Sequence, residues 1–412
     1  MRVTILVVFI ASSFFTGQIV DGADWGQFRG PLGNGVAVDS NPPIQWNAER
    51  NVKWKIMVPG QGWSSPVMGG GRVYLTAAVP SSDGHTLKAI GLDSRTGKTL
   101  WDTVVFKQPG DAPGIHGKNS HASPTPILAD GRLYVHFGHQ GTACLDTNGK
   151  ILWTNSTIHY APVHGNGGSP AISGDRLVFS VDGEKQAFIV ALSTKDGSEV
   201  WRRERVSGAT RKFSFSTPAI IDVNGITQVI SPGTDVVHAL DLKDGSIIWQ
   251  VSYDGYSVIP RPVFGHGMVY MSTGYGTPNV LAIALDGKGD VTNTHLRWRL
   301  QKGAPHTPSL LLVKDQLYMV SDRGIASCVD ARTGAIHWQQ RVGSAYSASP
   351  IYAAGRVYLL SEEGVGTVLA ASTEFKSLAV NDLQERSLAS YGVMGNSLVI
   401  RTAKHLFWVE GK

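Results

Sequence analysis

The stretch Asp330-Ala-Arg-Thr-Gly334-Ala-Ile-His-Trp338 decides the fold, because close copies of it recur along the chain. Asp93-Ser-Arg-Thr-Gly97, followed by Trp101, is the plainest second copy. In this pattern the aspartate caps backbone groups of a strand turn and the glycine takes a positive φ. The tryptophans of the repeat lie 40–52 residues apart, at Trp54, Trp101, Trp153, Trp201, Trp249, Trp298 and Trp338. A period of this length, with about four strands per unit, is typical of the blades of a β-propeller.

Each unit opens on a Ser/Thr-Pro pair or a variant of it, followed by a glycine-containing turn and an apolar strand. The openings are Ser65-Pro66, Ser123-Pro124, Ser169-Pro170, Thr217-Pro218, Arg261-Pro262, Thr307-Pro308 and Ser349-Pro350. The eighth unit is split: Ser390–Val409 supplies three strands at most, and Val52–Val58 around Trp54 has the pattern of a final outer strand. We therefore predict an all-β fold, an eight-bladed β-propeller of four-stranded antiparallel blades that is closed by an N-terminal strand. Such closure removes the free sheet edges that invite aggregation.

The N-terminal segment predicts export. Residues 1–22 combine Arg2, an apolar run and Gly22 at a suitable cleavage position, which is the pattern of a signal peptide. A retained membrane anchor is the alternative, although the run is short for a span that needs about 20 apolar residues. We expect residues 23–51 to form an N-terminal extension and residues 52–412 to form the propeller. The mature chain is then periplasmic or extracellular and has no transmembrane span.

Charge argues against nucleic acid as a partner. The net charge is +5, but no run rich in lysine and arginine occurs, and charged residues make up 17% of the chain. With 48 glycines and 11 tryptophans the composition suits short strands and tight turns. We expect a monomer.

The Asp-x-x-Thr-Gly-x-x-x-Trp repeat resembles the tryptophan-docking motif of the PQQ-like (pyrrolo-quinoline quinone) repeat propellers. Two further segments, Trp25-Gly-Gln-Phe-Arg-Gly-Pro31 and Gly62-Trp-Ser-Ser-Pro66, look like the start of exported members of that group. The resemblance covers nearly all of the mature chain. It implies either a PQQ-dependent dehydrogenase or a non-catalytic propeller similar to the lipoprotein that assists outer-membrane β-barrel assembly.

The repeated tryptophans and the two cysteines have structural interpretations. A tryptophan at the same place in each blade is expected to pack between neighbouring blades rather than to bind a ligand. Cys144 and Cys328 both occupy the small-residue position two before the motif aspartate, in blades two and six. These blades lie opposite each other in the ring, so we predict two free, buried thiols.

Candidate ligand-binding residues precede the openings, on the face that carries the long, variable loops. They are Trp63, His121, His164, Asn166, Phe215, Tyr256, His306 and Tyr346. Such a channel mouth suits a small polar or planar ligand, for example a sugar or a peptide segment. The alternative is that these side chains merely fill the channel and meet solvent.

We expect no metal site, since His136 and His139 are three apart on a presumed strand and would point to opposite faces. Under the dehydrogenase alternative the cofactors would be PQQ and calcium; otherwise we expect none. The sequence has no adjacent cysteine pair, no Cys-x-x-Cys-His and no Gly-x-Ser-x-Gly, and no catalytic residue can be assigned. The favoured function is a non-catalytic scaffold for a protein partner or a small polar ligand in the cell envelope.

Overall fold

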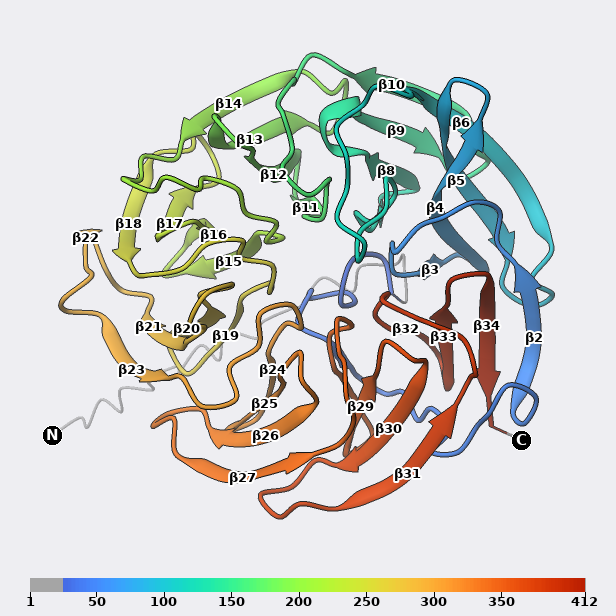
Figure 1. Cartoon of the computed structure of the whole chain (residues 1–412). Helices are drawn as coiled ribbons and strands as arrows, with labels where there is room; N and C mark the ends of the chain where they lie inside the picture. The colour runs from blue at the N-terminus through green and yellow to red at the C-terminus, as the bar shows by residue number, and fades with distance from the viewer. Residues whose placement is uncertain (1–24, 412) are drawn as a thin grey trace, which may run out of the picture.

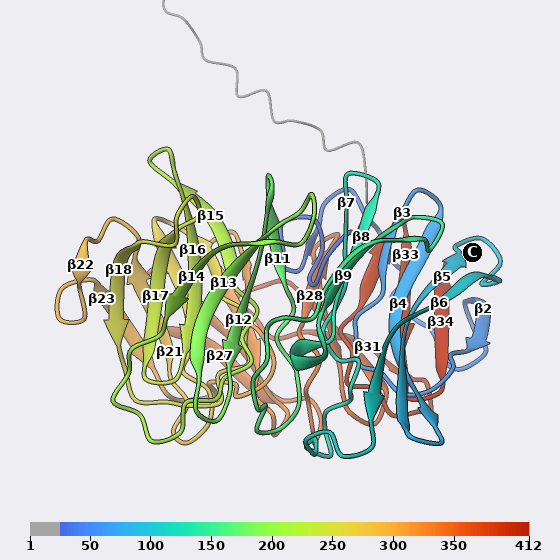
Figure 2. The same ribbon diagram turned by 90° about the horizontal axis from the view of Figure 1, so that it is seen from above.

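The computed structural model describes residues 25–411, so the predicted signal peptide lies outside the described residues. Eight sheets follow one another around a central axis in sequence order (Figure 1). Their strands run between the two faces of the ring (Figure 2). The predicted all-β, eight-bladed propeller of four-stranded blades is therefore confirmed. Among the described residues, no helix is long and apolar enough to cross a membrane.

The first four blades have the following strands. Blade 1 contains β3 (Val67–Gly69), β4 (Arg72–Ser81), β5 (Gly84–Asp93) and β6 (Thr99–Pro109). Blade 2 contains β7 (Ile127–Ala129), β8 (Arg132–His136), the short 3-10 helix η1 (Gly138–Gln140), β9 (Thr142–Asp146) and β10 (Ile151–Asn155). Blade 3 contains β11 (Ala171–Ser173), β12 (Arg176–Asp182), β13 (Ala187–Ser193) and β14 (Glu199–Glu204). Blade 4 contains β15 (Ala219–Val223), β16 (Ile226–Gly233), β17 (Val236–Asp241) and β18 (Ile247–Ser252), with the two-residue β22 (Gly289–Asp290) added in parallel.

The other four blades complete the ring. Blade 5 contains β19 (Val263–Gly265), β20 (Met268–Ser272), β21 (Val280–Ala284) and β23 (Leu296–Leu300). Blade 6 contains β24 (Leu311–Val313), β25 (Gln316–Val320), β26 (Ile325–Asp330) and β27 (Ile336–Arg341). Blade 7 contains β28 (Ile351–Ala353), β29 (Arg356–Leu360), β30 (Val365–Ala370) and β31 (Ser377–Asp382), with β1 (Val36–Ala37) added in parallel. Blade 8 contains β32 (Gly392–Met394), β33 (Ser397–Arg401), β34 (His405–Glu410) and β2 (Val52–Met57).

Ring closure occurs in blade 8, where β2 pairs antiparallel with the last strand, β34. Trp54 lies opposite Trp408 in this pairing, and their rings are 5.5 Å apart. The prediction that an N-terminal strand completes the last blade is confirmed.

Six of the repeated tryptophans join their blade to the next, whereas the Trp249 indole donates to Gln228 of its own blade (3.1 Å). The indole Nε1–H of Trp298 donates to the Ala331 carbonyl (3.0 Å) in the motif turn of blade 6. A Cβ added at Gly334 of the same turn would lie 2.9 Å from the Trp298 ring, and its φ is +75°, so both contact and backbone require glycine there. Equivalent indole bonds reach Ser94, Thr147, Thr194, Leu242 and Ser372 from Trp54, Trp101, Trp153, Trp201 and Trp338 respectively. The motif therefore specifies blade docking, as predicted.

Blade 7 has no tryptophan at this position, because Ala379 occupies the register that Trp338 has in blade 6. The N-terminal extension supplies a ring nearby. Trp46 is buried and stacks on Tyr358 (6.3 Å) and edge-on against Tyr391 (6.5 Å). The extension thus contributes to the packing between blades 7 and 8.

Residues 25–37, which we call the plug, cross the end of the channel where the inner strands finish. Trp25 is 1% exposed, and the Arg29 guanidinium donates to the Leu310 carbonyl of blade 6 (2.7 Å). Backbone bonds connect the plug to blades 1, 2 and 7: Trp25 with Met68 in both directions (3.2 and 3.0 Å), Leu128 N to Gly26 O (2.7 Å) and Tyr352 N to Gly35 O (2.8 Å). The plug therefore closes this end of the channel.

Cys144 on β9 and Cys328 on β26 are both free and fully buried, as predicted. Burial raises the pKa of each thiol to about 11. They behave as small core residues.

Candidate functional site

A ring of hydroxyl side chains surrounds the channel where the inner strands begin. In six places a backbone N–H donates to the hydroxyl oxygen of the equivalent residue in the next blade, over 2.9–3.0 Å. The acceptors, which we call the hydroxyl ring, are Thr125, Ser169, Thr217, Ser309, Ser349 and Ser390. Two blades depart from this pattern: Arg261 occupies the equivalent position in blade 5, and the Ser65 hydroxyl of blade 1 accepts no such bond among the described residues.

These bonds correct two predicted openings. In blade 2 the position equivalent to Ser65-Pro66 is Thr125-Pro126 rather than Ser123-Pro124. In blade 6 it is Ser309-Leu310 rather than Thr307-Pro308. Both predicted openings were therefore two residues too early.

A cavity of about 1230 Å³ opens at this end of the channel, which we call the mouth. Each blade contributes the side chain or backbone two residues before its ring position: Trp63, Ser123, Gly167, Phe215, Ile259, Thr307, Ser347 and Leu388. Phe28 of the plug also lines the cavity and lies at its closed end. The cavity is therefore a cup with one entrance.

Five of the eight candidate residues line this cup: Trp63, His164, Phe215, Tyr256 and His306. Their role in binding stays a prediction. Trp63 is half-buried, and the Arg386 guanidinium lies 5.8 Å from the centre of its ring.

The other three candidates lie elsewhere, so their expected place at the mouth is corrected. Asn166 and Tyr346 stand three residues before the ring and turn into the blades, whereas His306, at the same offset from Ser309, lines the cup. Asn166 is buried and accepts from the Tyr160 hydroxyl (2.7 Å), whereas Tyr346 is fully buried and donates to the Val342 carbonyl (3.2 Å). His121 was misplaced by the register error in blade 2.

His121 packs beside His85 instead, with ring centres 4.6 Å apart, and hydrogen bonds to Gln108 (2.9 Å). Burial and the neighbouring His85 lower its pKa to about 4. The alternation argument for His136 and His139 was also wrong, because β8 ends at His136 and His139 lies in η1. Among residues 25–411, no group of three or more histidine, cysteine or carboxylate side chains is arranged to hold a metal.

One side of the cup carries a continuous series of rings, the aromatic arc, formed by His164, Phe213, Phe215, Tyr256, Tyr275 and His306. Successive ring centres are 5.2 Å apart for His164–Phe213, 5.8 Å for Phe213–Tyr256, 5.5 Å for Tyr256–Tyr275 and 5.3 Å for Tyr275–His306. Sequence reasoning missed Phe213 and Tyr275. Phe213 stands two residues before Phe215, so alternation along an extended segment was the available signal.

The rest of the lining mixes apolar side chains, among them Trp63, Ile259 and Leu388, with charged ones. Arg211, Arg323 and Arg341 all line the cup and are exposed. Among the residues that the structure describes, Asp322 is the one carboxylate of the lining, and its Oδ2 accepts from the backbone N–H groups of His306 (2.7 Å) and Thr307 (3.3 Å). Lys118 forms an ion pair with Glu362 of blade 7 (2.7 Å), which ties the loop after β6 to that blade.

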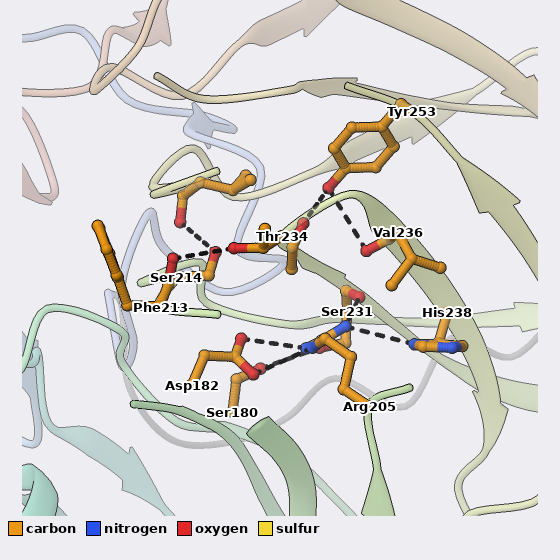
Figure 3. A network of polar contacts seen from close by, with 12 residues as sticks. Ser180, Asp182, Arg205, Phe213, Ser214, Ser231, Thr234, Val236, His238 and Tyr253 are labelled. Atoms are coloured by element: carbon orange, nitrogen blue, oxygen red, sulfur yellow. Dashed lines mark hydrogen bonds and ion pairs between the residues drawn. The ribbon is translucent and has the colours of Figure 1, made fainter. Parts of the chain in front are cut away.

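A buried network lies behind the aromatic arc and is drawn in Figure 3. Arg205 pairs with Asp182 (3.0 Å), and both side chains are at most 1% exposed. Arg205 also donates to the Ser231 carbonyl (2.9 Å), and His238 lies beside it. Burial and the arginine lower the pKa of His238 to about 3, so this histidine is neutral.

The network holds the arc through its backbone. The Ser214 amide donates to the Asp182 carbonyl (3.4 Å), and the Phe213 carbonyl accepts from the Thr234 hydroxyl (3.0 Å). The Phe215 amide donates to the Val258 carbonyl (2.7 Å). Residues 213–215 are therefore fixed by blades 3 and 4, while their two phenylalanine rings face the cup.

PQQ-dependent dehydrogenases, whose repeats this chain resembles, carry a calcium-bound quinone. Calcium takes about six to eight oxygen ligands, with carboxylates prominent among them. The cup offers the single carboxylate of Asp322, which already accepts two amide protons. The residues present do not fit that group.

The molecule is thus an eight-bladed β-propeller whose channel is closed at one end and forms a ligand-sized cup at the other. The chain belongs to the PQQ-like repeat family described as outer membrane protein assembly factor BamB, whose model matches residues 89–327 and 288–377. The resemblance inferred from the repeats is confirmed.

Individual relatives are more distant. The chain is 26% identical over 221 residues to a tetrathionate hydrolase of Acidithiobacillus ferrooxidans, covering 48% of this chain and 42% of the relative. It is 27% identical over 188 residues to a polyvinylalcohol dehydrogenase of a Pseudomonas species, covering 43% and 26%. The chain thus matches less than half the length of either relative. The crystal structure of BamB from Moraxella catarrhalis superposes with a TM-score of 0.58 at 14% identity, over 87% of this chain and 99% of that one, and shows the shared fold.

Proposed function

We propose that this protein is an exported, non-catalytic β-propeller that binds a ligand in the cup at its mouth. The observation that carries the proposal is the cup itself, closed by the plug and lined by the aromatic arc and the hydroxyl ring. Ligand sites are typically concave, largely apolar and equipped with a few convergent polar groups. The ligand is a small polar molecule or the end of a longer chain, because the cup has one entrance.

Non-catalytic binding agrees with the chemistry of the lining. Asp322 is occupied by two amide protons, and His306 and His164 have no carboxylate partner within the described residues that would orient them as a general base. The family description, an outer membrane assembly factor, supports a binding role in the cell envelope. We expect export through residues 1–22, a monomer in solution, no resident cofactor and no nucleic-acid partner.

The proposal is tested by binding to arrays of immobilised oligosaccharides and synthetic peptides, using protein that begins at Ala23. We expect retention on at least one array, and loss of that retention in the double variant Trp63→Ala, His306→Ala. Phe264→Ala is the matched control, because this exposed aromatic lies on β19 at the opposite end of blade 5. If retention survives the double variant but is lost in Phe264→Ala, the binding site lies on the face opposite the mouth, and the proposal is overturned.

A quinoprotein oxidoreductase is the second candidate, favoured by the match to a polyvinylalcohol dehydrogenase. Dye reduction with added PQQ, calcium and polyvinyl alcohol measures it directly. We expect no turnover above that of the PQQ and calcium alone. Turnover that requires the protein would overturn the non-catalytic proposal.

A further inference from the structure

The hydroxyl ring presents hydrogen-bond donors to the cup. Each of its six oxygens already accepts a backbone N–H from the preceding blade. All six side chains line the cup, and each is at most 5% exposed. Among residues 25–411, none of the six donates its own proton to a protein acceptor, so these O–H groups are free to donate to a ligand from many directions.

The cup also has an excess of positive charge. Arg211, Arg323 and Arg341 line it, and within the described part of the chain none of them forms an ion pair with a carboxylate. Lys118 is neutralised by Glu362. An arginine guanidinium matches a carboxylate with two parallel hydrogen bonds, which gives both strength and orientation.

Two arginines at the closed end add to the positive electrostatic potential of the cup. Arg261 donates to the Phe28 carbonyl (2.8 Å), directly behind the ring that closes the cup. Arg29 and Arg261 are both buried, and their charges lie close enough that Arg261 contributes, after burial, to lowering the pKa of Arg29 to about 9. Neither has a carboxylate partner among the residues described. Two uncompensated buried cations favour an anion in the cup above them.

The aromatic arc adds a second requirement for the ligand, because it offers a row of aromatic rings along one side of the cup, in addition to Trp63 elsewhere in the lining. Aromatic faces carry partial negative charge and pack well against the slightly positive C–H groups of another ring. A ligand that satisfies the whole cup therefore needs a flat C–H face, acceptor oxygens around its edge and an anionic group.

We infer that the cup binds the carboxylate-bearing pyranose at the end of an acidic glycan, that is, a terminal uronic acid. The ring faces the aromatic arc, its hydroxyl oxygens accept from the hydroxyl ring, and its carboxylate pairs with Arg323 and Arg341. An acidic peptide would supply the charge, but its acceptors lie along one edge and would leave most of the six donors unused. This inference rests on the proposed function and names its ligand class.

The test is isothermal titration calorimetry of the protein that begins at Ala23, with a glucuronic acid trisaccharide and the glucose trisaccharide of the same linkage. We expect the acidic sugar to bind at least about tenfold more tightly, as charge-assisted hydrogen bonds predict. The double variant Arg323→Gln, Arg341→Gln should remove this preference. The control Arg297→Gln, Arg299→Gln changes the net charge equally on the exposed outer strand β23 and should keep it.

The outcomes separate the inference from the proposed function. Equal affinity for the acidic and neutral trisaccharides would overturn the inference and leave the binding function intact. Tighter binding of a glutamate tripeptide than of the acidic sugar would overturn it in favour of a peptide ligand. Retention of no probe on either array would overturn the binding function, and the inference with it.

Discussion

The two ends of the channel are built on the same eight inner strands and differ in how their polar groups are used. At the closed end the plug binds the blades through backbone hydrogen bonds, and Trp25 is 1% exposed. At the mouth Tyr275 is 56% exposed, and the hydroxyl ring lines the cup without donating to a protein acceptor among residues 25–411. The closed end keeps its aromatic ring buried, although polar atoms of Trp25, Arg29 and Arg261 lie there without a hydrogen-bond partner among the described residues. The mouth instead keeps exposed rings and hydroxyl groups that donate to no protein acceptor in the described part of the chain.

This difference indicates where binding takes place. A stable fold places large apolar side chains and polar groups where they are buried and satisfied, and departures from that rule concentrate at functional sites. The mouth departs from it by exposing large aromatic rings, which the closed end does not do at Trp25. Mutations at the two ends should therefore separate into effects on stability and effects on binding.

The largest expected loss of stability is at the plug. Trp25→Ala removes a buried ring that packs on blade 1 and should lower the free energy of unfolding by about 3–5 kcal/mol. Chemical denaturation monitored by circular dichroism measures this. Leu32→Ala, in the same segment but 69% exposed, is the matched control and should change stability by less than about 0.5 kcal/mol. Equal effects of the two variants would show that the plug does not hold the ring.

The next effect concerns the buried pair behind the mouth. Arg205→Met leaves the Asp182 carboxylate without its partner and should lower the free energy of unfolding by about 3 kcal/mol. The double variant Asp182→Asn, Arg205→Met removes both charges and should recover part of that loss. Thermal denaturation compares the two. A double variant no more stable than the single one would argue against an uncompensated charge as the cause.

Acid should weaken the fold through histidines that burial keeps neutral. Burial lowers the pKa of His136 and of His238 to about 3, with Arg205 adding to the effect at His238. The unfolded chain takes up protons near pH 6.5 and the folded chain does not, so stability falls as the pH drops from about 6.5 toward 3. Between pH 6.5 and 5.5 each such histidine contributes about 1 kcal/mol to the loss.

Denaturation at both pH values tests this, with His238→Gln as the informative variant. Between pH 6.5 and 5.5 the free energy of unfolding of this variant should fall by about 1 kcal/mol less than that of the parent protein. His337→Gln, on the exposed side of β27, is the control and should follow the parent. An unchanged acid loss in His238→Gln would mean that His238 is protonated in the folded state.

The architecture could be predicted because its signals are local and repeated. The motif of Asp330 to Trp338 contains the turn, the glycine and the docking ring within nine residues, and the split blade follows from counting units. The register predicted for blade 2 was wrong for an equally local reason. Ser123-Pro124-Thr125-Pro126 contains two consecutive Ser/Thr-Pro pairs, and sequence alone does not show which one enters the ring.

The cup was predicted in part, because its residues come from every blade. Every position two before the ring lines the cup, but the positions three before it differ: Asn166 and Tyr346 are buried in the blades, and His306 lines the cup. The error of register in blade 2 moved His121 out of the site. The plug and the Arg205–Asp182 pair depend on contacts between distant segments, and neither leaves a periodic pattern. The plug and this ion pair are positioned by packing between segments that meet only in the complete fold, so no local pattern in the sequence reveals them.

The smallest expected effect on stability is at the mouth, and it gives the sharpest test of the comparison. Phe213 and Tyr275 contact each other through Tyr256 along the aromatic arc, but both rings face the cup and Tyr275 is largely exposed. The double variant Phe213→Leu, Tyr275→Ala should therefore change the free energy of unfolding by no more than about 1 kcal/mol. Its retention on the array that holds the parent protein should nevertheless fall by about tenfold or more, because the flat surface is lost. Denaturation and array binding on the same preparation measure both quantities. A large loss of stability with unchanged retention would mean that the arc belongs to the hydrophobic core. The mouth would then contribute to stability as the plug does, and the contrast between the two ends would fail.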